Sequence, residues 1–253
     1  MARADRFTGK RVVVLGGNSG IGLACAQGFA EEGAGVRLTG RDPQTIASAV
    51  ASIPGAKGNA VDISDLAAMD AFYETVAAEE GGIDVLMVNA GMGGFSLIED
   101  MTSEYWDQVH SINLRGCVFA MQKAVRLMGE GGAIVVTGSI GGHAFVPGNA
   151  AYGAAKAGLA LAMRQFAGEY VARGIRVNMV SPGPIETPLL YRNPGMDEAA
   201  VEAMREQMIA AVPMKRMGAA KEVADAVLFL ASNEASFVTA ANLMVDGGAL
   251  EIG

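Results

Sequence analysis

The chain has 253 residues, of which 51% are hydrophobic and 18% charged, a composition that suits one large buried core and excludes a disordered chain. Its formal net charge of −8 argues against nucleic acid or an anionic membrane surface as a partner, because an acidic protein gains nothing from releasing their counterions. No apolar run approaches the length of a membrane span, and residues 1–10 lack the hydrophobic centre of a secretory signal, so we expect a cytoplasmic protein that acts on small molecules.

Apolar, β-branched runs alternate with segments of helical period along the whole chain. The expected strands are residues 11–15, 36–39, 59–63, 85–89, 133–137, 175–180 and 243–245, and the expected helices are residues 21–32, 43–52, 66–80, 104–128, 152–173 and 222–232. Hydrophobic strands separated by helices are typical of a parallel sheet that is buried on both faces. The pattern predicts one α/β domain over residues 1–253, with a doubly wound Rossmann-type fold and a seven-stranded parallel sheet flanked by helices.

A glycine-rich turn with Gly16, Gly20 and Gly22 follows the first expected strand and leads into the first expected helix. Glycines let the backbone approach a pyrophosphate closely, and a helix N-terminus adds free N–H donors and partial positive charge. Because the chain holds 34 glycines, this spacing arises about 0.6 times by chance, so the spacing alone also fits a purely structural turn. The position between strand and helix favours a dinucleotide site.

Tyr152 and Lys156 stand four residues apart on an expected helix, so their side chains share one face. A phenol is a poor acid or base at neutral pH, but a neighbouring ammonium stabilises its phenolate form. With Ser139 thirteen residues before the tyrosine, the combination arises about 0.005 times by chance in a chain of this composition. Alone, each residue fits an ordinary structural role; together they indicate a catalytic group with Tyr152 as the acid/base.

Several other residues are structural or ambiguous. Cys25 and Cys117 lack the spacing of a metal or redox motif and His110 lies in an amphipathic helix, so we expect buried thiols, a structural histidine and no metal site. His143, in a glycine-rich loop, either touches the substrate or is an ordinary loop residue. A proline-rich insertion at about 182–213 is expected to lie over the site, and its methionines either adapt to an apolar substrate or fill the core; they are Met196, Met204, Met208, Met214 and Met217.

The motifs described above, together with several shorter ones and in their order along the chain, resemble those of the short-chain dehydrogenase/reductase family across essentially the whole chain. The matching motifs are Gly16-x-x-x-Gly20-x-Gly22, Asp62, Asn89-Ala90-Gly91, Asn113, Ser139, Tyr152-x-x-x-Lys156, Pro182-Gly183-Pro184-Ile185-Glu186-Thr187 and Val245-Asp246-Gly247-Gly248. The resemblance implies an NAD(P)-dependent enzyme that interconverts a ketone and a secondary alcohol by hydride transfer. It also implies a homo-oligomer, commonly a tetramer, built partly from the long helices expected at 104–128 and 152–173.

The resemblance assigns an expected role to each matching residue. Ser139 would hydrogen-bond the reacting oxygen, Tyr152 would exchange the proton, and Lys156 would hold the nicotinamide ribose and tune Tyr152. Asn113 would anchor a water that links Lys156 to solvent. Asp62 would contact the adenine, Asn89 to Gly91 would flank the cofactor and Thr187 would meet the carboxamide; the other expected cofactor contacts are Gly16, Asn18, Ser19, Gly20, Ile21, Gly22, Arg41, Ile63, Ala90, Pro182, Gly183 and Ile185.

Three residues depart from the family pattern. Leu15 stands where the family usually has Thr and Val88 where it has a second Asn, so we expect a buried hydrogen bond to be replaced by apolar contact, with little cost because both partners change. Ala240 replaces a usual Gly and is expected to alter a turn before the last strand.

The end of the second strand, about 20 residues after the glycine turn, is where the cofactor is selected. Gly40 stands where NAD-preferring relatives place an aspartate, and Arg41 follows with a guanidinium suited to a phosphate, so NADP(H) is favoured and NAD(H) stays possible. Asp42 either pairs with Arg41 or caps the next helix, and Arg41 alternatively is a solvated loop charge.

Two other functions compete with an oxidoreductase of freely diffusing carbonyl compounds and alcohols. The first is a 3-oxoacyl-carrier-protein reductase, but an acidic carrier requires a basic docking surface, for which only Lys123, Arg126 and Arg164 are candidates. The second is a non-catalytic dinucleotide sensor, which the presence of both Tyr152 and Lys156 disfavours.

Overall fold

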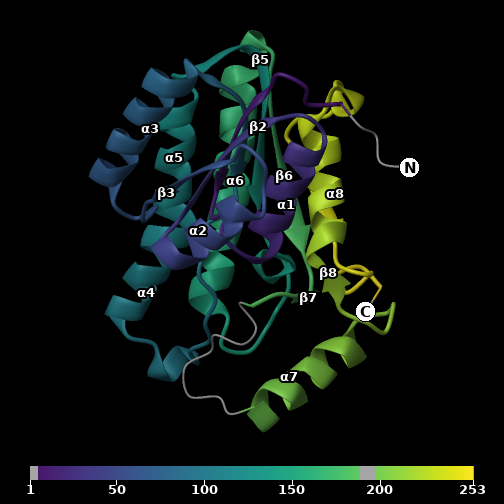
Figure 1. The fold of residues 1–253 in the computed structure, drawn as a ribbon. Coiled ribbons are helices and arrows are strands. Elements are labelled where there is room, and N and C mark those ends of the chain that lie inside the picture. The colour runs from purple at the N-terminus through teal and green to yellow at the C-terminus, as the bar shows by residue number, and fades with distance from the viewer. Residues whose placement is uncertain (1–4, 189–197, 253) are drawn as a thin grey trace.

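The computed structural model describes residues 5–188 and 198–252 and has a seven-stranded parallel sheet at its centre (Figure 1). The strand order is β3-β2-β1-β4-β5-β6-β9, so the chain starts in the middle of the sheet and winds outward first to one edge and then to the other. The strands are β1 (Arg11–Leu15), β2 (Gly35–Gly40), β3 (Lys57–Ala60), β4 (Ile83–Val88), β5 (Met128–Thr137), β6 (Ile175–Pro182) and β9 (Asn242–Val245). The predicted doubly wound, Rossmann-type sheet is confirmed.

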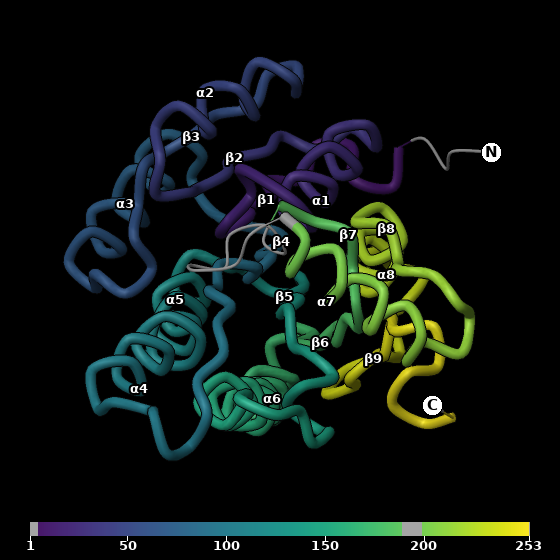
Figure 2. Tube along the Cα trace, turned by 90° about the horizontal axis from the view of Figure 1, so that it is seen from below, coloured from purple at the N-terminus to yellow at the C-terminus, as the bar shows by residue number. Residues whose placement is uncertain are grey.

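Helices cover both faces of the sheet, as the end-on view in Figure 2 shows. One face carries α1 (Gly20–Glu31), α2 (Pro43–Ala51) and α8 (Ala220–Ala231), and the other carries α3 (Leu66–Glu80), α5 (Cys117–Ala124) and α6 (Ala150–Tyr170). Successive side chains of a strand point to opposite faces of the sheet, so each strand contributes to both halves of the core. In β1, Val12 and Val14 pack on the first face, whereas Val13 and Leu15 pack on the second. Two-sided burial explains why the strands read as continuous apolar runs.

Some expected elements differ from the structure, among them the strand expected at 133–137, which is β5 and begins already at Met128. The helix expected at 104–128 is divided into α4 (Ser103–His110), a π-helical segment (Ser111–Gly116) and α5, which ends at Ala124 before β5 begins at Met128. The strand expected at 59–63 is β3 (Lys57–Ala60), an edge strand whose apolar continuation lies beyond Ala60, its last residue paired with β2.

The predicted insertion contains a small second sheet and a separate helix. The two-residue strands β7 (Ile185–Glu186) and β8 (Gly218–Ala219) pair in parallel, and α7 (Glu198–Ala211) lies across the carboxyl ends of the central strands in Figure 2. Pro194 and Met196 of the insertion lie outside the described residues.

Both cysteines are free and buried, as expected, and burial raises the pKa of Cys25 to about 12 and that of Cys117 to about 11. Over the described ranges, no helix is long and apolar enough to cross a membrane.

Leu15 and Val88 are direct neighbours in the sheet. They are paired residues of β1 and β4, and both side chains are buried in the same core cluster. An apolar pair therefore fills the position at which the family pattern places a threonine and an asparagine, as the sequence predicted. Since neither residue leaves a polar group without a partner, the exchange has little energetic cost.

Ala240 adopts a left-handed backbone conformation, with φ of 59°, in the turn that leads into β9. Its N–H donates to the carbonyl of Val177 at 2.8 Å, so the ladder of the sheet holds the residue in this conformation. A non-glycine residue pays a steric cost of about 1 kcal/mol there, which identifies the altered turn as a strained one.

We therefore expect Ala240→Gly to raise the free energy of unfolding by about 0.5–1 kcal/mol, because glycine adopts this conformation without strain. Chemical denaturation of wild type and variant measures the change. Ala203→Gly, at an exposed position of α7, is the control and is expected to lower stability by a similar amount. A loss of stability in Ala240→Gly would contradict the strain.

Candidate active site

A cavity of about 730 Å³ opens at the carboxyl ends of the central strands β1 and β4. These two strands are neighbours, but the chain continues from β1 toward one edge of the sheet and from β4 toward the other. In open parallel sheets this edge is the usual ligand position. Of the residues that the sequence singles out as catalytic or cofactor-binding, only Gly22 does not line it. The lining includes Gly16, Asn18, Ser19, Gly20, Ile21, Arg41, Asp62, Ile63, Asn89, Ala90, Gly91, Asn113, Ser139, Tyr152, Lys156, Pro182, Gly183, Ile185 and Thr187.

The glycine turn is packed so closely that side chains are excluded from it. A Cβ atom on Gly22 would lie 2.0 Å from the carbonyl oxygen of Gly16, and one on Gly16 would lie 2.7 Å from the Cα of Ala90. Gly22 therefore lies beneath the cavity and allows the turn to close, which explains why it is absent from the lining. The turn leads into the twelve-residue helix α1, whose N-cap Ser19 makes no side-chain capping bond, so the helix presents its N-terminal donors to the cavity.

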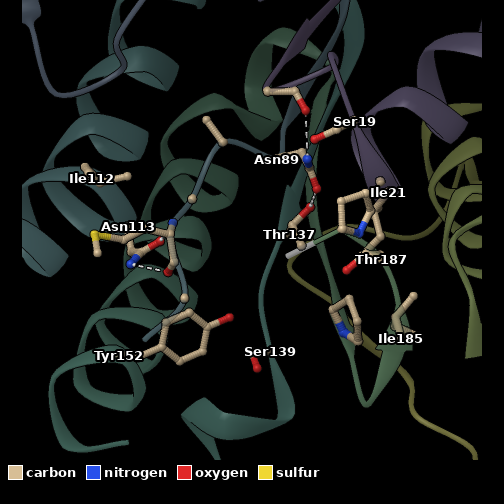
Figure 3. Close-up of a pocket in the computed structure, with 18 of the residues that line it drawn as sticks. Ser19, Ile21, Asn89, Ile112, Asn113, Thr137, Ser139, Tyr152, Ile185 and Thr187 are labelled. Carbon is tan, nitrogen blue, oxygen red and sulfur yellow. Dashed lines mark hydrogen bonds between the residues drawn. The ribbon is translucent and has the colours of Figure 1, made fainter. Parts of the chain in front are cut away.

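Asn89 joins three segments behind this turn (Figure 3). Its Nδ2 donates to the carbonyl of Gly16 at 3.0 Å, and its Oδ1 accepts from the Thr137 hydroxyl at 3.0 Å. The N–H of Gly16 in turn donates to the Thr39 hydroxyl at 3.2 Å. Both threonines were missed by the sequence analysis. Thr137 is the last residue of β5 and Thr39 the last but one of β2, and a position at the end of a buried strand is the one signal that marks them.

Tyr152 and Lys156 lie on the first turns of α6, as their spacing predicts. The Lys156 ammonium is buried, lies 5.7 Å from the centre of the Tyr152 ring and donates to the carbonyl of Thr137 at 2.8 Å. An ammonium has three N–H donors, and the described residues accept one from Lys156. The other two are available to ligand hydroxyls and to the phenolic oxygen of Tyr152.

Ser139 projects into the same part of the cavity as the Tyr152 hydroxyl (Figure 3). The Ser139 Oγ accepts a hydrogen bond from the Gly141 N–H at 3.1 Å, which leaves its own O–H as a donor. The Gly141 carbonyl accepts from Asn149 Nδ2, also at 3.1 Å. Asn149, the N-cap residue of α6, therefore ties the turn after Ser139 to the helix that carries Tyr152, a connection that was not foreseen.

Asn113 lies fully buried in the π-helical segment. Its Oδ1 accepts from the N–H of Met92 at 2.9 Å and its Nδ2 donates to the Met92 carbonyl at 3.1 Å (Figure 3). A π-turn inserts an extra residue into a helix and is frequent at functional sites. Here it accompanies an asparagine that fixes the loop after β4 against the cavity.

At the other end of the cavity, the side chain of Asn18 lies over Gly40 and fills the space where a Cβ atom would stand. A Cβ atom on Gly40 would lie 2.4 Å from Cγ of Asn18, whose Nδ2 donates to Thr45 Oγ1 at 2.8 Å. Asp42 caps α2 by accepting from the N–H groups of Gln44 and Thr45, which agrees with one of its two expected roles. Arg41 is exposed beside it and lines the cavity.

The segment after β6 closes the cavity over the glycine turn. A Cβ atom on Gly20 would lie 3.4 Å from Cβ of Thr187, so these two parts of the chain approach to van der Waals distance. Beyond them Met204, Met208 and Met217 line the cavity, whereas Met214 is exposed. Met204, Met208 and Met217 therefore fit the expected role of contacting an apolar substrate rather than that of filling the core.

Neither histidine lines the cavity. His143 Nε2 lies 3.0 Å from Nδ2 of Asn242, whose Oδ1 accepts from the Ser181 hydroxyl at 2.7 Å, so the ring is directed toward β9. His110 stacks on Trp106, with ring centres 4.1 Å apart, in a structural role. Within residues 5–188 and 198–252, no group of three or more His, Cys, Asp or Glu side chains is placed to hold a metal ion.

Comparison with known proteins gives consistent matches over nearly the full length. Residues 16–249 match a family model described as Enoyl-(Acyl carrier protein) reductase. The chain is 40% identical to Oxidoreductase asL5 of Sarocladium schorii, with 100% of both chains covered, and 38% identical to the 3-oxoacyl-[acyl-carrier-protein] reductase FabG of Escherichia coli, with 96% of this chain and 98% of the relative covered. A solved short chain dehydrogenase/reductase family protein has 38% identity and a TM-score of 0.86, with 97% of this chain and 99% of that one covered.

Proposed function

The chain belongs to the short-chain dehydrogenase/reductase family and is an oxidoreductase that uses a nicotinamide cofactor; on this basis we propose that it interconverts a ketone and a secondary alcohol with Tyr152 as the acid/base. The observation that carries the proposal is the convergence of Ser139, Tyr152 and the buried Lys156 at one end of the cavity.

Each catalytic side chain has a distinct task. Ser139 donates its hydroxyl hydrogen to the carbonyl oxygen and so holds it beside Tyr152. Tyr152 gives its proton to that oxygen in reduction and removes it in oxidation. The buried ammonium of Lys156 stabilises the phenolate through charge, and its position 5.7 Å from the ring supports this role.

The residues of the cavity fit a dinucleotide. The turn at Gly16 and Gly20 and the N-terminus of α1 provide a backbone cradle for the pyrophosphate, and a remaining N–H donor of Lys156 suits the nicotinamide ribose. Asp62 and Ile63 line the cavity and are proposed to contact the adenine, and Ile185 and Thr187 line it and are proposed to contact the nicotinamide. The bound nicotinamide supplies or accepts the hydride.

The cofactor proposed is NADP(H). Gly40 supports this choice, because position 40 carries no carboxylate that would repel a 2′-phosphate. Arg41, exposed at the same edge of the cavity, has the planar donors that suit a phosphate.

We expect wild type to prefer NADP(H) and Arg41→Ala to lose about 1.5–3 kcal/mol of that preference, the scale of a charge-assisted hydrogen bond. The ratio of kcat/KM with the two cofactors measures the loss. Arg126→Ala, an exposed arginine at the end of α5, is the matched control and should leave the ratio unchanged. An NAD(H) preference that Arg41→Ala does not affect would show that Arg41 is only a solvated charge.

A second candidate, reduction of 3-oxoacyl groups on a carrier protein, is favoured by the family model and by the FabG relative. The charge distribution disfavours it. Lys123 pairs with Asp70. Arg126 lies just before β5 begins, at the amino ends of the strands, whereas the cavity lies at their carboxyl ends. The segment that leaves the cavity wall carries exposed acidic residues: Glu99, Asp100, Glu104 and Asp107. Turnover of a 3-oxoacyl group on an acidic carrier, faster than that of the same group on a short thioester, would support this candidate.

The proposed quaternary structure is a homo-oligomer, a tetramer by resemblance. Two surfaces support it: α4 and α6 expose Trp106 and Leu161, and the edge strand β9 exposes Leu243. Sedimentation equilibrium tests this proposal, and a monomer at all concentrations would contradict it.

A further inference from the structure

The charges that line the cavity are concentrated at its dinucleotide end. Arg41 and Asp42 follow β2, and Asp62 follows β3, so all three lie at one side of the strand order. Lys156 is the fourth charged residue of the described lining and stands beside Tyr152. Past Ser139 and Tyr152, therefore, the part of the wall that the structure describes bears no charged side chain.

That part of the wall is built from large apolar side chains on two separate segments. Met92 and Phe95 come from the loop after β4, and Met204 and Met208 come from α7. The two α7 methionines are four residues apart, so one face of the helix presents both to the cavity. Thioethers are flexible and polarizable, and they adapt to apolar groups of varied shape.

The apolar surface continues from the cavity onto its rim. The Ser96 N–H donates to the Gly148 carbonyl at 2.9 Å and so joins two loops beside the mouth. These loops expose large hydrophobic side chains: Phe95, Leu97, Ile98, Phe145 and Val146. With Phe145 91% exposed, the rim is far more hydrophobic than a solvated loop requires, which is typical of a binding surface.

Building on the proposed function, we propose that the substrate is an uncharged ketone or secondary alcohol with a bulky apolar group, an alkyl chain or an aryl ring, that packs against Met92, Phe95, Met204 and Met208. A carboxylate or phosphate in this position would lose its hydration without a cation to pair with. The hydroxyls of a sugar would likewise lose hydrogen bonds to water.

The test compares three methyl ketones under one set of conditions, with NADPH and with NADH: 2-butanone, 2-octanone and 7-oxooctanoate. The last two have the same length and differ only in a terminal methyl or carboxylate group. We expect kcat/KM to rise by up to about fourfold for each methylene between 2-butanone and 2-octanone, because each is removed from water on binding. We expect 7-oxooctanoate to be poorer than 2-octanone by about 100-fold or more.

A charge introduced into the wall tests the location. Met208→Lys is expected to raise the ratio of kcat/KM for 7-oxooctanoate to that for 2-octanone by about tenfold or more, because the new ammonium pairs with the carboxylate. Gln207→Lys places the same charge on the neighbouring exposed position of α7 and should leave the ratio unchanged. Because the ratio is taken within one preparation, partial unfolding of a variant does not alter it.

The results separate the substrate class from the reaction. Equal turnover of 2-octanone and 7-oxooctanoate by wild type, or the same change of ratio in both lysine variants, would overturn the apolar wall and leave the oxidoreductase function intact. Failure to reduce any ketone with either cofactor would overturn the proposed reaction, and with it the substrate class.

Discussion

Tyr152→Phe is expected to lower kcat by about 10²–10⁴-fold, the contribution of a positioned acid/base, while the affinity for the cofactor stays nearly unchanged. The variant keeps the ring that packs beside Lys156 and removes only the hydroxyl that exchanges the proton. Steady-state kinetics with 2-octanone measure kcat, and fluorescence titration with NADPH measures binding.

Tyr170→Phe is the matched control because it makes the same change on the same helix, at a residue that stacks on Phe166 away from the cavity. Its activity should equal that of wild type. Residual activity of Tyr152→Phe within tenfold of wild type would contradict the acid/base role, whatever the cofactor affinity.

Lys156→Met is expected to impair both turnover and cofactor binding, since one ammonium serves the Tyr152 oxygen and the nicotinamide ribose. The cofactor dissociation constant should rise by about tenfold or more, the scale of a hydrogen bond to a charged group, and kcat should fall by about 10²-fold or more. Methionine keeps most of the buried stem of the side chain, so the packing of α6 against the sheet is largely preserved.

Lys123→Met removes a lysine that pairs with Asp70 at the surface, and it should change neither quantity. Circular dichroism with thermal unfolding of both variants separates a loss of fold from a loss of function. Unchanged cofactor affinity in folded Lys156→Met would rule out the ribose role.

The order and type of most elements follow from the sequence because two-sided burial makes each strand an apolar run. The same signal is ambiguous at the sheet edge: Val61 and Ile63 extend the apolar pattern of β3, but the strand ends at Ala60, where pairing with β2 ends. The pattern of apolar residues also does not distinguish an α-helix from a π-helix. The apolar period across 104–128 does not reveal the π-helical turn at Asn113, because one extra residue barely shifts the pattern.

The residues of the site that carry a family motif could be placed from the sequence, but those that hold them in position could not. Thr39 and Thr137 act through hydrogen bonds between segments that are distant in the chain, and Asn149 acts through a hydrogen bond between a loop and the helix that follows it. The residue types of all three are common in any protein. The orientation of His143 toward Asn242 depends on the same kind of long-range contact. The pattern of neighbouring residues in the sequence does not predict such hydrogen bonds.

Transfer of deuterium from the cofactor is the most direct test of hydride exchange between a nicotinamide and a carbonyl compound. NADPH deuterated at C4 on one face, and then on the other, is incubated with 2-octanone and the wild-type enzyme, and the alcohol is analysed by mass spectrometry. We expect NADPH labelled on one face of C4 to deliver its deuterium to the carbinol carbon and NADPH labelled on the other face to deliver none. Tyr152→Phe should transfer deuterium no faster than its residual rate of turnover. Consumption of NADPH without deuterium in the alcohol from either face would contradict the reaction proposed for this site.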